Sequence, residues 1–168
     1  PYYTDDKIHD AGSTTGSKTI LLAERDGRSH LWTPFDQCVS PYRIERNLYK
    51  NAFGNKVVFE EVNRDLNLTF RYQWAASELY GFVRQARLTS FADQPMQVSV
   101  LDGIQNVLPY GVPEGLQRGS SNLVDAYKKC ELEDGNLGIY ALSAIITDKA
   151  EPSESLKANV VWSVGFDS

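Results

Sequence analysis

LTFRYQW, residues 68–74, decides the fold, because apolar and polar side chains alternate strictly along it. A period of two places successive side chains on opposite faces of a β-strand, and no helix produces this pattern. We therefore expect a strand with one face on a core and the other in solvent. The side chains expected to face the core are Leu68, Phe70, Tyr72 and Trp74.

Turn signals and further short strands precede this stretch. Asp26-Gly27 separates two apolar runs, and the pair favours a hairpin because glycine accepts a positive φ without steric penalty. Residues 42–49 and 56–62 predict two more strands, with a turn at Gly54 between them. The chain before residue 74 therefore has the pattern of consecutive antiparallel strands.

The remainder of the chain continues in the same style. Residues 82–91 and 96–105 flank Ala92–Pro95 and predict a long antiparallel hairpin. A loop rich in Pro and Gly follows at 109–115, and residues 123–129 predict one short helix after three capping residues. The last expected strands are residues 138–147 and 158–164.

Eight to ten strands with one short helix favour an all-β fold. We expect an antiparallel β-sandwich rather than a βαβ arrangement, because strands follow one another with few helical patterns between them. Residues 1–17 are polar and predict an irregular lead-in, and residues 18–168 predict a single sandwich domain. The first residue is Pro1 rather than Met, so we expect this chain to be an excerpt of a larger protein.

The composition and net charge limit the kinds of partner that we expect for this chain. The net charge is −5, so we expect no nucleic acid, and an acidic chain is also poorly suited to an anionic membrane. No apolar run approaches the roughly 20 residues that cross a bilayer. Cys38 and Cys130 match no metal-ligand spacing. We interpret them as two free thiols, with a single bridge as the alternative, so the cellular compartment stays open.

No arrangement of residues predicts a catalytic, metal or cofactor site. His9 and His30 lack a second ligand at zinc spacing. Glycoside chemistry needs two carboxylates across a cleft, and sequence spacing places no such pair among Asp65, Asp102, Glu114 and Asp125. We interpret Glu60-Glu61 as a strand segment with one solvated side.

Aromatic residues are the one suggestive group. The chain has three Trp and nine Tyr, and sugars stack on exposed aromatic rings. The competing interpretation is that most of these rings fill the core, as the alternation around Trp74 indicates. The candidate contacts, with sugar or with another domain, are Tyr110, Leu116, Trp32 and Trp162.

Several stretches also carry a family resemblance. They are residues 42–49, 70–74 and 81–84, and above all 101–111, LDGIQNVLPYG. Together they resemble the N-terminal β-supersandwich of cellobiose-phosphorylase-like bacterial proteins, which is akin to the galactose-mutarotase-like sandwich. The similarity runs from about Tyr42 to Gly165.

The resemblance implies a supporting role. In such glycoside phosphorylases and hydrolases the acid carboxylate lies in a separate (α/α)6 barrel, which this chain lacks, so no catalytic residue transfers to it. We therefore expect a non-catalytic sandwich domain that supports a C-terminal barrel in the parent chain, in the bacterial cytoplasm or periplasm. The alternatives are an autonomous carbohydrate-binding module that takes an oligosaccharide, and a mutarotase-like enzyme with a His acid and a Glu base.

Overall fold

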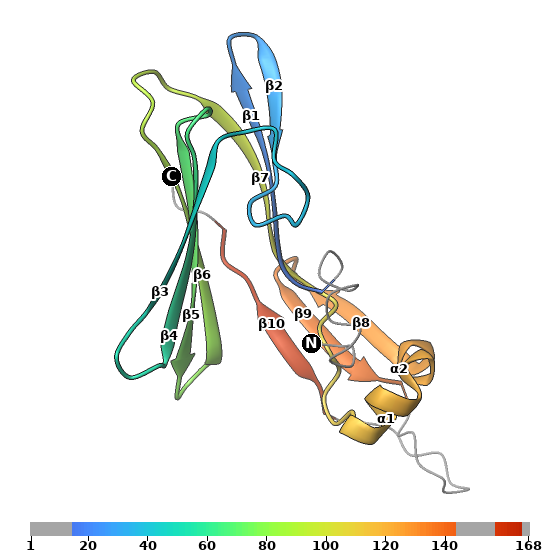
Figure 1. Ribbon diagram of the computed structural model, residues 1–168. Helices are drawn as coiled ribbons and strands as arrows, with labels where there is room; N and C mark the ends of the chain where they lie inside the picture. The colour runs from blue at the N-terminus through green and yellow to red at the C-terminus, as the bar shows by residue number, and fades with distance from the viewer. Residues whose placement is uncertain (1–14, 144–156, 166–168) are drawn as a thin grey trace, which may run out of the picture. The chain divides into compact units, whose positions relative to one another are not determined.

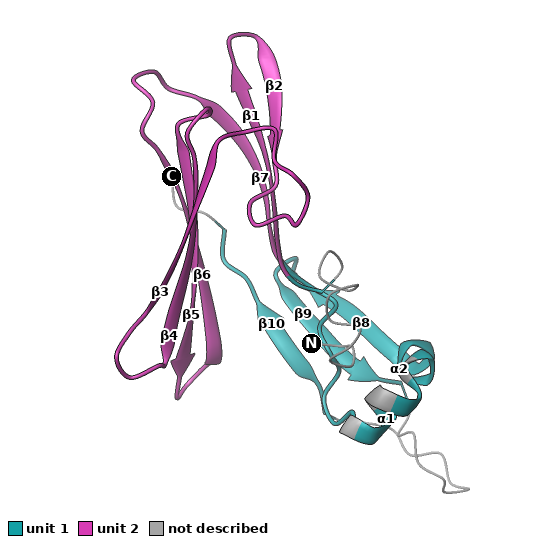
Figure 2. Cartoon of the chain, viewed as in Figure 1, with its two compact units in different colours: residues 1–16, 104–168 teal, residues 17–103 magenta. Residues whose placement is uncertain are grey.

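The computed structural model describes residues 15–143 and 157–165. This part of the chain is all-β, with ten strands in three antiparallel sheets and two short helices. The chain forms two compact units (Figure 2): the sandwich unit, residues 17–103, and the second unit, residues 1–16 with 104–168. The single domain expected over residues 18–168 stays a prediction.

Two sheets make the sandwich unit and face each other (Figure 1). Sheet A has the strand order β2-β1-β7, and sheet B has the order β3-β4-β5-β6. The strands of sheet A are β1 (Gly16–Arg25), β2 (Arg28–Trp32) and β7 (Gln97–Gln105). The strands of sheet B are β3 (Ile44–Lys50), β4 (Lys56–Asn63), β5 (Leu68–Ser77) and β6 (Gly81–Ser90).

The core lies between sheets A and B, and the alternating stretch forms its sheet B side. Leu68 and Phe70 are fully buried, and Tyr72 packs against the same cluster. Leu21 and Trp32 complete the cluster from sheet A. The expected inward face of residues 68–74 is therefore confirmed at its first three apolar positions, and Trp74 lies half-buried further along the strand.

The Asp26-Gly27 hairpin is also confirmed. β1 and β2 pair antiparallel from Leu21↔Trp32 to Arg25↔Arg28. Asp26 has φ of 52° and Gly27 has φ of 70°, the two positive angles that a two-residue turn of this hand requires.

The long hairpin expected between residues 82–91 and 96–105 is wrong. β6 is an edge strand of sheet B, whereas β7 pairs with β1 in sheet A. The connection crosses from one sheet to the other, because Val98 and Val100 pack on the core from the sheet A side. The Phe91 amide donates to the Asn67 carbonyl at 3.0 Å, which ties the end of β6 to the β4–β5 turn.

The second unit contains sheet C, with the strand order β10-β9-β8. The expected short helix corresponds to α2, and another short helix, α1, precedes it. Val124 and Leu142 form a small core here, with Leu108, Val112 and Leu116 packed against it. The elements are α1 (Glu114–Gly119), α2 (Ser121–Tyr127), β8 (Lys128–Glu133), β9 (Leu137–Leu142) and β10 (Asn159–Trp162).

Two further expectations concern cysteines and membranes. Cys38 and Cys130 are both free and exposed, as the first interpretation held. Among the described residues, no helix is long and apolar enough to cross a membrane. The expected lead-in lies outside the described residues up to residue 14, and β1 begins at Gly16.

Candidate functional site

The sandwich unit contains an open hollow of about 420 Å³. Strand β2, the loop of residues 33–42 and single side chains from β3 and β4 line it, so it lies where the chain leaves sheet A for sheet B. Its volume falls within the range of small-ligand pockets. The residues that matter for its chemistry are His30, Trp32, Asp36, Tyr42, Arg46 and Glu61.

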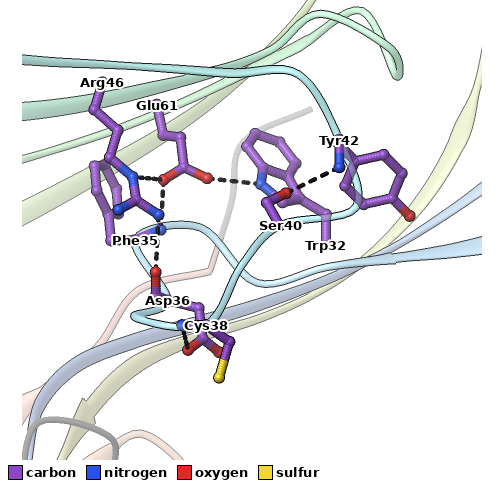
Figure 3. Close-up of polar contacts among 8 residues, drawn as sticks. All are labelled: Trp32, Phe35, Asp36, Cys38, Ser40, Tyr42, Arg46 and Glu61. Carbon is purple, nitrogen blue, oxygen red and sulfur yellow. Dashed lines mark hydrogen bonds and ion pairs between the residues drawn. The ribbon is translucent and has the colours of Figure 1, made fainter.

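Glu61 is the central polar group of the hollow (Figure 3). Its side chain is 2% exposed and belongs to the inner face of β4, opposite Phe70. Trp32 Nε1 donates to Oε1 at 2.9 Å, and the Phe35 amide donates to Oε2 at 2.8 Å. Arg46 Nε donates to Oε2 at 2.7 Å, which supplies the compensating charge that a buried carboxylate needs.

The same carboxylate holds the loop of residues 33–42 in place. Phe35 has φ of 62°, a conformation that a bulky side chain rarely adopts and that the surrounding structure must therefore enforce. Its ring lies edge-on to Tyr72 at 5.3 Å between centroids. Arg46 Nη2 donates to the Asp36 carbonyl at 2.8 Å. Glu61 and Arg46 thus fix the backbone of this loop, and Tyr72 packs against the Phe35 ring.

The rest of the lining is aromatic and weakly polar. Tyr42 is half-buried, and its hydroxyl donates to the Leu31 carbonyl at 3.0 Å. The Tyr42 amide donates to Ser40 Oγ at 3.1 Å. The Cys38 amide donates to Asp36 Oδ1 and holds the pKa of that carboxyl below its usual value. The hollow therefore offers the half-buried Tyr42 ring and an ionised carboxylate.

The arrangement does not favour acid–base catalysis by Glu61. Both of its oxygens already accept hydrogen bonds, so a substrate proton would have to displace a structural donor. His30 lines the same hollow, and its pairing with Ala23 places it on the core-facing side of β2. Glu61 is therefore better placed to hold the loop than to transfer a proton.

Glu60 and Asp102, the other buried carboxylates of the sandwich unit, also have structural partners. Glu60 lies on the opposite face of β4 and accepts hydrogen bonds from Asn47, Tyr49 and Arg71. Burial alone would raise the pKa of Glu60, but these donors, Arg71 first, outweigh it and the pKa lies below its usual value. Asp102 pairs with an arginine of sheet B.

The interpretation of Glu60-Glu61 as a segment with one solvated side is wrong. Both residues are buried, one on each face of sheet B. The signal for Glu61 was present, since it continues the inward row of Val57 and Phe59. A charged residue at a core position requires a partner, and Arg46 occupies the facing inward position on β3. The spacing of Arg46 and Glu61 in the sequence did not by itself predict that these two residues form an ion pair.

The four candidate contact residues fall in different units. Trp32 is buried in the sandwich core, while the other three belong to the second unit. Tyr110 is 45% exposed and lies under the Lys157 ammonium at 5.5 Å from the ring centroid. Leu116 is half-buried against the small core, and Trp162 is exposed on β10.

Within the described residues, no group of three or more His, Cys, Asp or Glu side chains is placed to hold a metal ion. Of the two histidines, His9 lies outside that part of the chain. Searches of protein-family models and of curated proteins found no match to this chain.

Proposed function

We propose that this chain is a non-catalytic β-sandwich domain of a carbohydrate-active protein similar to cellobiose-type phosphorylases. Its role is to support a C-terminal helical catalytic barrel of the parent chain. The family part of this proposal rests on the resemblance of residues 42–49, 70–74, 81–84 and 101–111. The non-catalytic part rests on the structure of the sandwich unit.

The observation that carries the non-catalytic role is the use of the buried carboxylates. A glycoside-cleaving site needs one protonated and one ionised carboxyl, both turned toward a cleft. Glu60, Glu61 and Asp102 are instead each held by an arginine within the sandwich. Of these three, Glu61 alone lines the hollow, and its two oxygens are occupied. Such carboxylates fix strands and loops rather than transfer protons.

Turnover assays test this role directly. The purified chain should release no nitrophenol from nitrophenyl β-glucosides and should form no sugar phosphate from cellobiose and inorganic phosphate. A glycoside phosphorylase of known activity is the positive control. Turnover by the chain that disappears in Glu61→Gln or Asp102→Asn, with the fold intact by circular dichroism, would overturn the proposal.

A second function, an autonomous carbohydrate-binding module, is favoured by one observation. The hollow has the half-buried Tyr42 ring and polar groups, and an aromatic ring beside polar groups is the combination that binds a sugar ring. Trp162 on β10, 63% exposed, offers a separate stacking surface. Against this function, Trp32 presents almost no surface, because its ring is 2% exposed and its indole nitrogen is bound to Glu61.

Calorimetry separates the two functions. A scaffold should give no heat with soluble cello-oligosaccharides at millimolar concentration. A binding module should give micromolar affinity that Tyr42→Ala or Trp162→Ala abolishes, and the affected residue would identify the unit that binds. The control is Leu132→Ala, since Leu132 is a large exposed apolar residue of sheet C that lies outside the hollow.

A further inference from the structure

Each of the three sheets ends in two edge strands. The edges are β2 and β7 in sheet A, β3 and β6 in sheet B, and β10 and β8 in sheet C. An edge strand presents a row of N–H and C=O groups to which another strand can pair, and native proteins cover such edges or protect them with charge. β8 (Lys128–Glu133) lies at one side of sheet C (Figure 1), and its sequence sets it apart from the other edges.

β8 is exposed along nearly its whole length. Residues 129–133 are exposed on both faces of the strand, and Leu132 is 69% exposed. Among the described strands, β8 pairs with β9 alone, in a register that places Cys130 opposite Tyr140. The strand carries two Lys and two Glu, so its net charge is zero. Like charge therefore does not keep a second copy of β8 away from this edge.

The pairing of a strand with its own copy obeys a parity rule. A twofold axis makes two identical edge strands antiparallel, and residues opposite each other in an antiparallel pair lie on the same face of the sheet. Side chains alternate between the two faces along a strand. A residue can therefore lie opposite itself, or opposite a residue that is an even number of positions away in the sequence.

This rule distinguishes β8 from the other five edge strands. In β8, Lys129 and Glu131 are two positions apart on one face and form an ion pair of 2.8 Å within the strand. In β3, Glu45 is an odd number of positions from both Arg46 and Lys50, so no allowed register brings its opposite charges together. Within their described bounds, β2, β6, β7 and β10 do not contain both a carboxylate and a Lys or Arg.

One register of two β8 strands matches the charges best. With the twofold axis at Cys130, Lys129 lies opposite Glu131 of the second copy, and each such pair of opposite charges stabilises a sheet. An axis at Glu131 would instead place two Glu131 side chains opposite each other, which is destabilising. On the other face, the axis at Cys130 places Leu132 opposite Lys128 of the second copy, whose methylene stem can cover it.

We propose that β8 binds β8 of a second copy of this chain, antiparallel and with Cys130 opposite Cys130. Two copies of sheet C then form one sheet of six strands, in the order β10-β9-β8-β8-β9-β10. The proposal goes beyond the supporting role and does not depend on it, because it follows from sheet C alone. Six paired residues make a small interface, so the dimer should be weak and its population should rise with protein concentration.

Charge reversal tests the register, with the full chain followed by sedimentation velocity. Lys129→Glu and Glu131→Lys each replace two attractive pairs of the dimer by two repulsive pairs, and each should weaken self-association about tenfold. An equimolar mixture of the two variants should associate as tightly as the unchanged chain, because positions 129 and 131 then carry opposite charges across the axis. The mixture does not restore the ion pair within each strand, so a merely structural role of that pair would give no recovery.

The two exposed cysteines give an independent readout. Opposite residues of an antiparallel pair have Cα atoms about 4.5–5.5 Å apart, within the range of about 4.4–6.8 Å that a disulfide spans. Oxidised glutathione should therefore couple two Cys130 thiols into one disulfide and be reduced to two molecules of glutathione. Cys38→Ser should cross-link like the unchanged chain on a non-reducing gel. Cys130→Ser, which keeps the exposed Cys38, should stay monomeric.

A variant of the opposite edge of sheet C is the matched control. Val160 on β10 is 62% exposed, and Val160→Glu should leave self-association unchanged. Loss of self-association in Val160→Glu would place the contact at β10 and overturn the proposal. Monomers at every concentration up to millimolar, no recovery in the mixture, or cross-linking through Cys38 as fast as through Cys130 would also overturn it. None of these results changes the turnover and sugar-binding assays, so the supporting role stands or falls separately.

Discussion

The Arg84–Asp102 pair offers the sharpest test of how the sandwich is held together. Arg84 on β6 and Asp102 on β7 join sheet B to sheet A through two hydrogen bonds of 2.6 and 2.8 Å. Their side chains are 9% and 8% exposed. Thr19 Oγ1 also donates to Asp102 at 2.6 Å, and Arg84 stacks over Tyr72. We predict that Arg84→Met and Asp102→Leu each destabilise the protein strongly.

The expected magnitude follows from burial. Removing one partner leaves the other charge with little water and no counter-charge, which costs about 3–5 kcal/mol. The double variant Arg84→Met with Asp102→Leu leaves no buried charge. Its main remaining defect is the Thr19 hydroxyl without an acceptor, which costs about 1–3 kcal/mol. The double variant should therefore be more stable than the sum of the single variants predicts, by at least about 3 kcal/mol.

Urea unfolding at neutral pH measures these values, with fluorescence of Trp32 and Trp74, both in the sandwich unit, as the probe. The matched control is the exposed pair Arg64–Glu45, also 2.6 Å apart, whose side chains are about half exposed. Arg64→Met should cost at most about 1 kcal/mol. Raising the salt concentration should weaken the exposed pair more than the buried pair.

Two results would refute the reasoning. Single variants at Arg84 and Asp102 that cost no more than Arg64→Met would mean that water reaches the pair. Additive single and double variants would mean that the two side chains contribute independently, contrary to the bidentate geometry.

Three further predictions follow. Phe70→Ala should cost about 3–5 kcal/mol in urea unfolding because it empties part of the core, and a cost below about 1 kcal/mol would contradict the register. The free energy of unfolding should decrease as the pH drops below 4.5, the ordinary pKa of Glu60, because the pKa of Glu60 is lower in the folded chain and the unfolded chain therefore binds more protons. Glu60→Gln should make the free energy of unfolding depend less on pH in this range, and an unchanged dependence would refute the prediction. Glu61→Gln should speed hydrogen exchange of the Phe35 amide, while amides of β5 exchange as before.

The strand pattern and the all-β class follow from the sequence alone. The alternation of residues 68–74 and the Asp26-Gly27 turn are local signals, since each depends on side chains or φ angles within a few residues. The register of β5 and the first hairpin were predictable for that reason. The expected helix corresponds to α2, although two of the three expected capping residues lie within the helix and Ser120, which precedes it, makes no side-chain capping hydrogen bond.

Only the tertiary structure decided which strands pair and which charges meet. Residues 82–91 and 96–105 look like a hairpin, yet they lie in different sheets, because β7 pairs with β1 across a long sequence separation. Glu61 and Arg46 are 15 residues apart, and their contact depends on the β3–β4 register. The partial covering of sheet B was equally invisible in the sequence. The alternation of apolar and polar residues predicts which face of a strand is apolar. How much of that face is buried depends on the length of the sheet that packs against it.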